Sequence, residues 1–212
     1  CTTKHSNFIR NKLSCATGRE KFNEVNMKIV SFTMVNNESE IIESFVRYNY
    51  NFVDEMVIID NGCTDSTIKI IRNLIAEGFK ITVYDESLEA YNQYRLDNKY
   101  LNKIINEIKP DWILPLDADE FLTGENNPRE VIEKLPMDNI YYVTWRWYVM
   151  TKNDNEKEAF IPKKMQYCLI RPAWNYSDGT PVTKAIIPAA YYKKMGLTLS
   201  MGCLLYTSPS PR

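Results

Sequence analysis

Histidine is almost absent from this 212-residue chain, and its cysteines are few and scattered. The one histidine is His5, so the body of the chain has no material for a Ser-His-Asp triad or a His-rich metal site. The five cysteines are odd in number and form no Cys-x-x-Cys pair, which argues against zinc ribbons and disulfide frameworks. A reducing cytosol is therefore the expected compartment. Any chemistry must come from carboxylates, amides, hydroxyls and aromatic rings.

The chain also lacks a strong net charge and a long apolar run. Its formal net charge of −1 provides no basic field, so a nucleic acid is not an expected partner. No stretch approaches the roughly 18 to 20 apolar residues of a membrane-spanning helix, so no transmembrane segment is expected. Residues 1–26 resemble no signal peptide, and their role stays open. The rest of the chain is long enough for one globular domain, and a hydrophobic fraction of 44% for the whole sequence is typical of such domains.

Strand-like and helix-like patterns alternate over the first half of the chain. The strand-like runs are apolar and rich in β-branched residues, and they lie at 28–35, 55–60, 80–84 and 111–116. Apolar residues recur at helical spacing over 38–52, between Ser66 and Gly78, and over 91–108. This alternation predicts an α/β fold with a mostly parallel, Rossmann-like sheet flanked by helices on both faces.

Two details refine this pattern. Asn36 and Asn37 precede the segment 38–52, and we expect them to cap its helix. Pro115 lies within the fourth strand-like run and has no N–H to donate. It therefore predicts a strand edge, a bulge or the last turn of the strand.

The second half of the chain, residues 123–202, has a less regular pattern. Residues 140–150 are aromatic and β-branched and predict one strand, in which Trp145 and Trp147 share a face. These aromatic residues suit sheet packing, and the alternative is that one face stacks against an acceptor sugar. Short β segments follow at 165–171 and 184–188. We expect a smaller, irregular, β-rich half.

Polar side chains follow each strand of the first half. They are Asn36, Asn37, Glu38, Asp60, Asp85, Asp117 and Asp119. The carboxyl ends of parallel strands meet at one edge of a sheet, where ligands bind. The sequence therefore predicts a polar, acidic site at this edge.

The Asp117-Ala118-Asp119 segment is the sharpest chemical signal. Residues two apart in an extended segment point the same way, so both carboxylates can reach one cation. Two close carboxylates repel unless a cation or donor neutralises them, and Mg²⁺ or Mn²⁺ does so while keeping positions open for phosphate oxygens. The alternative is a solvated turn after a strand.

Three segments together resemble glycosyltransferase family 2, whose members have the GT-A fold. They are VSFTMVNNESEII, VIIDNGCTDST and WILPLDADEFL. The resemblance covers Met27–Leu122 well and 141–202 loosely. It divides the chain into a nucleotide-sugar-binding half, 27–122, and an acceptor half, 123–202.

The resemblance implies roles for single residues in binding the donor. Val35, Asn37 and Glu38 would line the nucleoside pocket, and Asp60 would bond the base or ribose. Asp119, with help from Asp117, would hold the Mn²⁺ or Mg²⁺ that bridges the phosphates.

Several of these implied roles have alternatives. Asp60 is also explained by a tight turn at Asn61-Gly62. Asp85, at the third strand end, is either a donor-binding residue or a helix cap. Arg95 matches the position of a phosphate- or sugar-binding arginine only in part. Its alternative is a surface charge paired with Asp97 or Glu89.

An inverting transferase also needs a general base to deprotonate the acceptor hydroxyl. In the family this base is an acid downstream of the Asp-x-Asp motif, and Glu120 and Asp178 are the candidates by residue type. The last ten residues, 203–212 (CLLYTSPSPR), resemble translated sequencing-adaptor read-through, and the alternative is a flexible tail. We therefore expect the acceptor half to be incomplete after Gly202. Since the chain begins at Cys1 rather than Met, we also expect its natural start to be missing.

The resemblance implies a metal-dependent transferase that moves a sugar from a nucleotide diphosphate sugar to a glycan or lipid-linked acceptor. It also implies a cytoplasmic location, with a peripheral position at the inner membrane face as a variant. Two alternatives differ in class. One is a non-catalytic module that binds a nucleotide sugar or glycan. The other is a Mg²⁺-dependent phosphohydrolase, in which the Asp-x-Asp motif would follow the first strand rather than the fourth.

Overall fold

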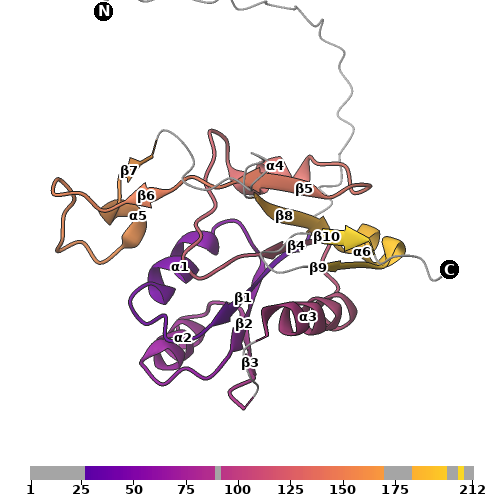
Figure 1. The fold of residues 1–212 in the computed structure, drawn as a ribbon, viewed down its shortest axis with the longest axis horizontal. Helices are drawn as coiled ribbons and strands as arrows, with labels where there is room; N and C mark the ends of the chain where they lie inside the picture. Colours follow the sequence, from indigo (N-terminus) through magenta and orange to yellow (C-terminus); the bar gives the residue numbers. More distant parts are fainter. Residues whose placement is uncertain (1–26, 89–91, 170–182, 200–204, 208–212) are drawn as a thin grey trace, which may run out of the picture.

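The fold is built on a six-stranded sheet with the order β3-β2-β1-β4-β8-β5 (Figure 1). The computed structural model describes residues 27–88, 92–169, 183–199 and 205–207. The strands of the sheet are β1 (Ile29–Val35), β2 (Glu55–Asp60), β3 (Ile81–Asp85), β4 (Trp112–Pro115), β5 (Tyr141–Thr144) and β8 (Thr183–Pro188). The first four are parallel, β8 is antiparallel to β4, and β5 is antiparallel to β8. The predicted, mostly parallel sheet is confirmed.

Helices cover both faces of the sheet. On one face lie α1 (Ile42–Asn49) and α2 (Thr67–Ala76), and on the other lie α3 (Gln93–Glu107) and α6 (Ala189–Met195) (Figure 1). Successive residues of β2 alternate between these faces, since Ile58 packs with α1 and α2 while Ile59 packs with α3. Both residues are fully buried. This two-sided burial explains why the strands are continuous apolar runs rather than alternating ones.

The first half follows the predicted element order closely. The bounds of β2 match the predicted strand 55–60, and Pro115 is the last residue of β4, one of the positions expected for it. The predicted capping role of Asn36 and Asn37 is wrong: the N-cap position of α1 is Ile41, and no side chain caps this helix. Both asparagines instead bond to the loop after β2.

The second half is irregular, as predicted, but its aromatic strand is not continuous. The expected strand 140–150 is wrong, because it divides into β5 and β6 (Tyr148–Val149). Between them, Trp145 and Trp147 lie outside any strand, with their rings edge to face and their centroids 6.2 Å apart. The remaining elements are α4 (Pro128–Glu133), α5 (Ile161–Lys164), β7 (Tyr167–Cys168), β9 (Leu197–Leu199) and β10 (Leu205–Thr207).

Two small sheets complete this half. Strand β6 pairs with β7, and β9 pairs with β10, which falls within the segment 203–212 predicted to be a tail. Helix α5 contacts α1, where Ser44 Oγ accepts a hydrogen bond from the Ile161 N–H. The boundaries 1–26, 27–122, 123–202 and 203–212 stay predictions.

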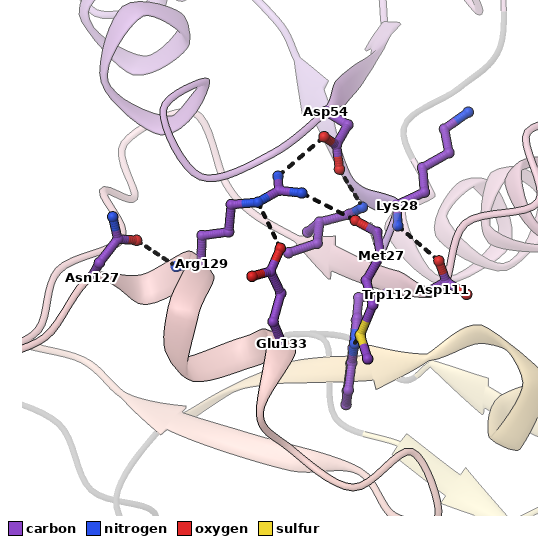
Figure 2. Close-up of polar contacts among 9 residues, drawn as sticks. Met27, Lys28, Asp54, Asp111, Trp112, Asn127, Arg129 and Glu133 are labelled. Carbon is purple, nitrogen blue, oxygen red and sulfur yellow. Dashed lines mark hydrogen bonds and ion pairs between the residues drawn. The ribbon is translucent and has the colours of Figure 1, made fainter. Parts of the chain in front are cut away.

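Arg129 ties the start of the sheet to α4 (Figure 2). Its contacts with Met27 and Asp54 lie at the amino ends of β1 and β2, opposite the strand ends predicted to bind a ligand. Its guanidinium group lies 3.1 Å from Asp54 and 2.8 Å from Glu133, and it donates to the Met27 carbonyl at 3.1 Å. Asp54 in turn accepts the Ile29 N–H at 2.7 Å. One side chain therefore holds the chain entering β1, the turn before β2 and α4 together.

Replacing Arg129 with methionine is expected to lower the free energy of unfolding by about 1 to 2 kcal/mol. The substitution keeps an apolar stem but removes two partly exposed ion pairs and a hydrogen bond to a carbonyl. Urea denaturation would measure the change. The matched control is Lys134→Met, since Lys134 is 78% exposed and 3.9 Å from Glu130. An equal effect of the two substitutions would contradict the role given to Arg129.

Candidate active site

The carboxyl ends of the parallel strands lie side by side in register. Val35 of β1 is opposite Asp60 of β2, and Asp60 is opposite Asp85 of β3. The first residue after β4, Leu116, donates its N–H to the Phe32 carbonyl of β1, so the Asp117–Asp119 segment follows at the same edge. The structure thus brings the predicted strand ends together.

Asn37 joins the loop after β1 to the loop after β2. Its backbone has φ 61°, a left-handed conformation that asparagine tolerates better than most residues. Its side-chain oxygen accepts hydrogen bonds from the Thr64 N–H (2.8 Å), the Thr64 hydroxyl (3.2 Å) and the Asp65 N–H (3.1 Å). This amide oxygen is therefore already engaged within the protein, and its visible role is to shape the edge.

Three predicted donor-binding residues have local structural roles. The Asp60 carboxylate accepts hydrogen bonds from the N–H groups of Gly62 (3.1 Å) and Cys63 (2.8 Å). These bonds close a tight turn at Asn61-Gly62, as the alternative explanation of Asp60 expects. Asp85 accepts the Ser87 N–H at 2.9 Å, and hydrogen bonds from the side chain and then the backbone of Ser87 lower the pKa of the Asp85 carboxyl. The Val35 side chain is buried in the apolar core. Only the backbone of Val35 therefore borders the edge.

Carboxylates from the loops after β1 and β2 lie close enough to the Asp117–Asp119 segment to interact with its charges. The pKa of Glu38 is raised, first by burial and then by the negative charges of Asp119, Asp65 and Asp117. Asp119 is exposed and makes no hydrogen bond or ion pair with another described residue. A cation bound among these groups would relieve their mutual repulsion.

The turn that carries Asp119 is held from two sides. Within the turn, the Glu120 N–H donates to the Asp117 carbonyl (3.0 Å), and the Asp117 N–H donates to Glu120 Oε2 (2.9 Å). From α1, the fully buried Asn49 donates to the Glu120 carbonyl (2.8 Å) and accepts the Leu122 N–H (2.9 Å). From β8, Lys184 Nζ lies 2.7 Å from Asp117 and 3.3 Å from Glu120.

Two buried acids near this turn have raised pKa values. Burial raises the pKa of Asp97 on α3 to about 7, against the attraction of Lys184 and with a contribution from the charge of Asp117. Burial also raises the pKa of Glu120, opposed by Lys184. Asp97 is 3% exposed, and its Oδ2 has no hydrogen-bond partner among the described residues.

The sequence reasoning did not identify Asp97, Asn49 or Lys184 as site residues. A signal was present for two of them. Asp97 occupies the buried face of α3, one turn before Leu101, and Lys184 is the second residue of the otherwise largely apolar strand β8. A charged residue at a position that the apolar pattern assigns to the core indicates a buried ionic partner.

Arg95 and the two candidate bases, Glu120 and Asp178, are not grouped around Asp119 by any contact that the structure shows among the described residues. Arg95 is exposed in the first turn of α3, where its charge helps to lower the pKa of Glu86, after the larger effects of hydrogen bonds from Lys99 and Tyr100. Glu89, one of its two predicted alternative partners, and the candidate base Asp178 lie outside the described residues. Glu120 is engaged by Lys184 and by the Asp117 N–H.

The described residues contain no group of three or more His, Cys, Asp or Glu side chains arranged to hold a metal ion. The donor set nevertheless fits a hard divalent cation. Mg²⁺ is usually bound through one or two carboxylates together with substrate phosphates and water, rather than by a cage made only of protein. In such an arrangement, Asp119 and the second oxygen of Asp117 would be the two protein ligands.

In the part of the chain that the structure describes, we find no helix with the length and apolar character needed to cross a bilayer.

Fold and site together define an α/β protein whose parallel strands end at an acidic edge, the position at which sheets of this class bind ligands. The sequence pattern of glycosyl transferase family 2 matches residues 34–191, and the chain belongs to this family. The resemblance noted from its three motifs is thus confirmed.

Two bacterial relatives match part of the chain. An uncharacterized glycosyltransferase of Rickettsia bellii is 28% identical over 137 residues, which cover 64% of this chain and 43% of that protein. Its counterpart in Rickettsia felis is 26% identical over 137 residues, with 64% and 44% coverage. The matched region thus spans less than half the length of these relatives.

Solved structures give partial likenesses. A mannosyltransferase from Pyrobaculum calidifontis, in complex with GDP-Man and Mn²⁺, is 18% identical with a TM-score of 0.42, over 54% of this chain and 34% of that chain. Glucosyl-3-phosphoglycerate synthase from Mycobacterium tuberculosis, in complex with Mn²⁺, UDP and glucosyl-3-phosphoglycerate, is 21% identical with a TM-score of 0.35, over 50% and 37%.

Proposed function

We propose that this chain is the catalytic domain of a metal-dependent glycosyltransferase. It would move a sugar from a nucleotide diphosphate sugar to a hydroxyl group of a glycan or lipid-linked acceptor, in the cytoplasm or at the inner face of the membrane. The observation that carries the proposal is the exposed Asp119 on an anchored turn after β4, beside Asp117 and Glu38, in a member of glycosyl transferase family 2.

Each part of the edge has a task in this proposal. Asp119 and Asp117 would hold Mn²⁺ or Mg²⁺. When bound, such a cation neutralises charge that develops on the diphosphate leaving group, an effect of several kcal/mol. The loops shaped by Asn37 and Asp60 would border the nucleoside, and Arg95 and Asp85 would lie toward the phosphates or sugar.

The proposed reaction also needs a general base that deprotonates the acceptor hydroxyl. Glu120 is a poor candidate, because its carboxylate already pairs with Lys184 and accepts the Asp117 N–H. A base must reach the acceptor proton at hydrogen-bond distance. Asp178 stays the second candidate.

Thermal unfolding of the full chain tests donor binding. UDP, GDP and simple phosphate esters are added with and without Mn²⁺, since a ligand that binds the folded state raises the transition temperature. We expect stabilisation by a nucleoside diphosphate that requires Mn²⁺. Stabilisation by phosphate esters without any effect of a nucleotide would favour the phosphohydrolase alternative and contradict the proposal.

A second measurement separates the enzyme from a binding module. With Mn²⁺ and the sugar conjugate of the stabilising nucleotide, we expect slow release of free nucleoside diphosphate, because water replaces the acceptor in many transferase sites. Binding without any turnover, in the presence of simple glycan acceptors as well, would favour the non-catalytic module.

A further inference from the structure

Lys184 is a buried cation at the centre of the acidic edge. Its side chain is 3% exposed, although lysine is almost never fully buried unless it is paired. It comes from β8, which is antiparallel to β4, so the start of β8 lies beside the end of β4. Its ammonium group therefore reaches the Asp117–Glu120 turn from the half of the chain predicted to bind the acceptor.

The contacts of Lys184 close a ring around this turn. Nζ lies 2.7 Å from Asp117 Oδ2 and 3.3 Å from Glu120 Oε2, and the same Glu120 oxygen accepts the Asp117 N–H at 2.9 Å. Neither carboxylate can rotate without breaking a charge-assisted hydrogen bond. The ring fixes the base of the turn and leaves Asp119 exposed at its apex.

A purely stabilising role does not explain this arrangement well. Removing a lysine from water costs several kcal/mol, and a buried ion pair often contributes no more to stability than apolar residues of the same volume. The neighbouring residues of β8, Ala185 to Ile187, are buried and apolar, so methionine would suit the strand. The ring does provide orientation, which a ligand carboxylate needs from its outer partners.

We propose that Lys184 is a positioning residue for the donor site: it holds Asp117 and Glu120 so that the Asp119 carboxylate meets the metal and diphosphate in a fixed orientation. The inference rests on the proposed function. Because Lys184 is nearly inaccessible to solvent, it acts through the turn and does not touch the donor. The β-rich half thus completes the nucleotide-sugar site.

The test compares Lys184→Met with wild type and with Lys194→Met, an exposed lysine on α6. Calorimetric titration with UDP or GDP, whichever stabilises wild type, is done with and without Mn²⁺ well below every unfolding transition. We expect Lys184→Met to weaken the Mn²⁺-dependent affinity at least tenfold, as substitutions of such outer partners do. Affinity without Mn²⁺, and both affinities of Lys194→Met, should stay within about twofold of wild type.

The outcomes separate the two proposals. If folded Lys184→Met binds the nucleotide as tightly as wild type, the positioning role is overturned while the proposed function stands. The same holds if its affinity falls by the same factor with and without Mn²⁺. If wild type shows no Mn²⁺-dependent binding, the proposed function fails and this inference fails with it. If Lys184→Met does not fold, Glu120→Gln decides the question. It breaks the Lys184–Glu120 ion pair, leaves the Lys184–Asp117 pair and keeps an oxygen for the Asp117 N–H. Unchanged Mn²⁺-dependent affinity would then overturn the inference that the closed ring orients Asp119.

Discussion

Asp119→Asn is expected to abolish most Mn²⁺-dependent nucleotide binding while leaving the fold at least as stable as before. We expect a loss in affinity of about 100-fold, or about 3 kcal/mol. The substitution keeps the size of the side chain but removes the charge, and hard divalent cations prefer carboxylate oxygens. Asp119 makes no hydrogen bond or ion pair with another described residue, so its replacement breaks no such contact there.

Asp119→Asn is also expected to affect the free energy of unfolding, in the direction opposite to its effect on binding. The negative charge of Asp119 helps to raise the pKa of Glu38, which means that the two carboxylates repel in the folded state. Removing it should therefore leave the free energy of unfolding unchanged or slightly higher in the absence of metal. Binding and stability would then move in opposite directions, as expected of a functional residue rather than a structural one.

Asp138→Asn is the matched control, because it makes the same chemical change at an exposed position. Strand β5 runs in the same direction as β4, so Asp138, just before β5, lies toward the opposite edge of the sheet. Calorimetric titration with the stabilising nucleotide and Mn²⁺ measures both variants. If Asp119→Asn binds like Asp138→Asn, the proposed metal role of Asp119 is wrong.

The order of helices and strands was predictable because each element carries its own apolar pattern in a continuous stretch of sequence. The apolar run 55–60, for example, coincides with β2, since a strand buried on both faces must be apolar throughout. The predicted meeting of the strand ends also held, because the carboxyl ends of parallel strands share one edge whatever the side chains.

What sequence reasoning missed depends on contacts between distant segments. Asn37 reads locally as a helix cap, but its amide oxygen bonds Thr64 and Asp65 of another loop. The strand predicted over 140–150 breaks at Trp145 and Trp147, a departure that strand propensity does not encode. Lys184 and Asp117 are 67 residues apart, and only the antiparallel placement of β8 brings them within 2.7 Å.

Asp97 gives the second large expected effect, on the pH dependence of stability. Its pKa is about 7 in the folded protein, against about 3.9 for an unfolded aspartate. Between these values the folded state holds a proton that the unfolded state has lost, so stability falls as the pH rises from about 4 to about 7. Above pH 7 the full cost remains, and we expect it to be about 2 to 4 kcal/mol.

Asp97→Asn removes this cost because an amide is neutral at every pH. The excess of the variant over wild type in free energy of unfolding should grow by about 2 kcal/mol or more between pH 5 and pH 8. Urea denaturation at pH 5, 6, 7 and 8 measures the difference. Glu38 and Glu120 also have raised pKa values, but they are present in both proteins. Their contributions to the pH dependence of stability therefore largely cancel in the difference between variant and wild type. Asp138→Asn should give a curve parallel to wild type. Were Asp97→Asn parallel as well, Asp97 would already be ionised at pH 5, and the burial of an uncharged carboxyl group beneath the Asp117–Asp119 turn would be wrong.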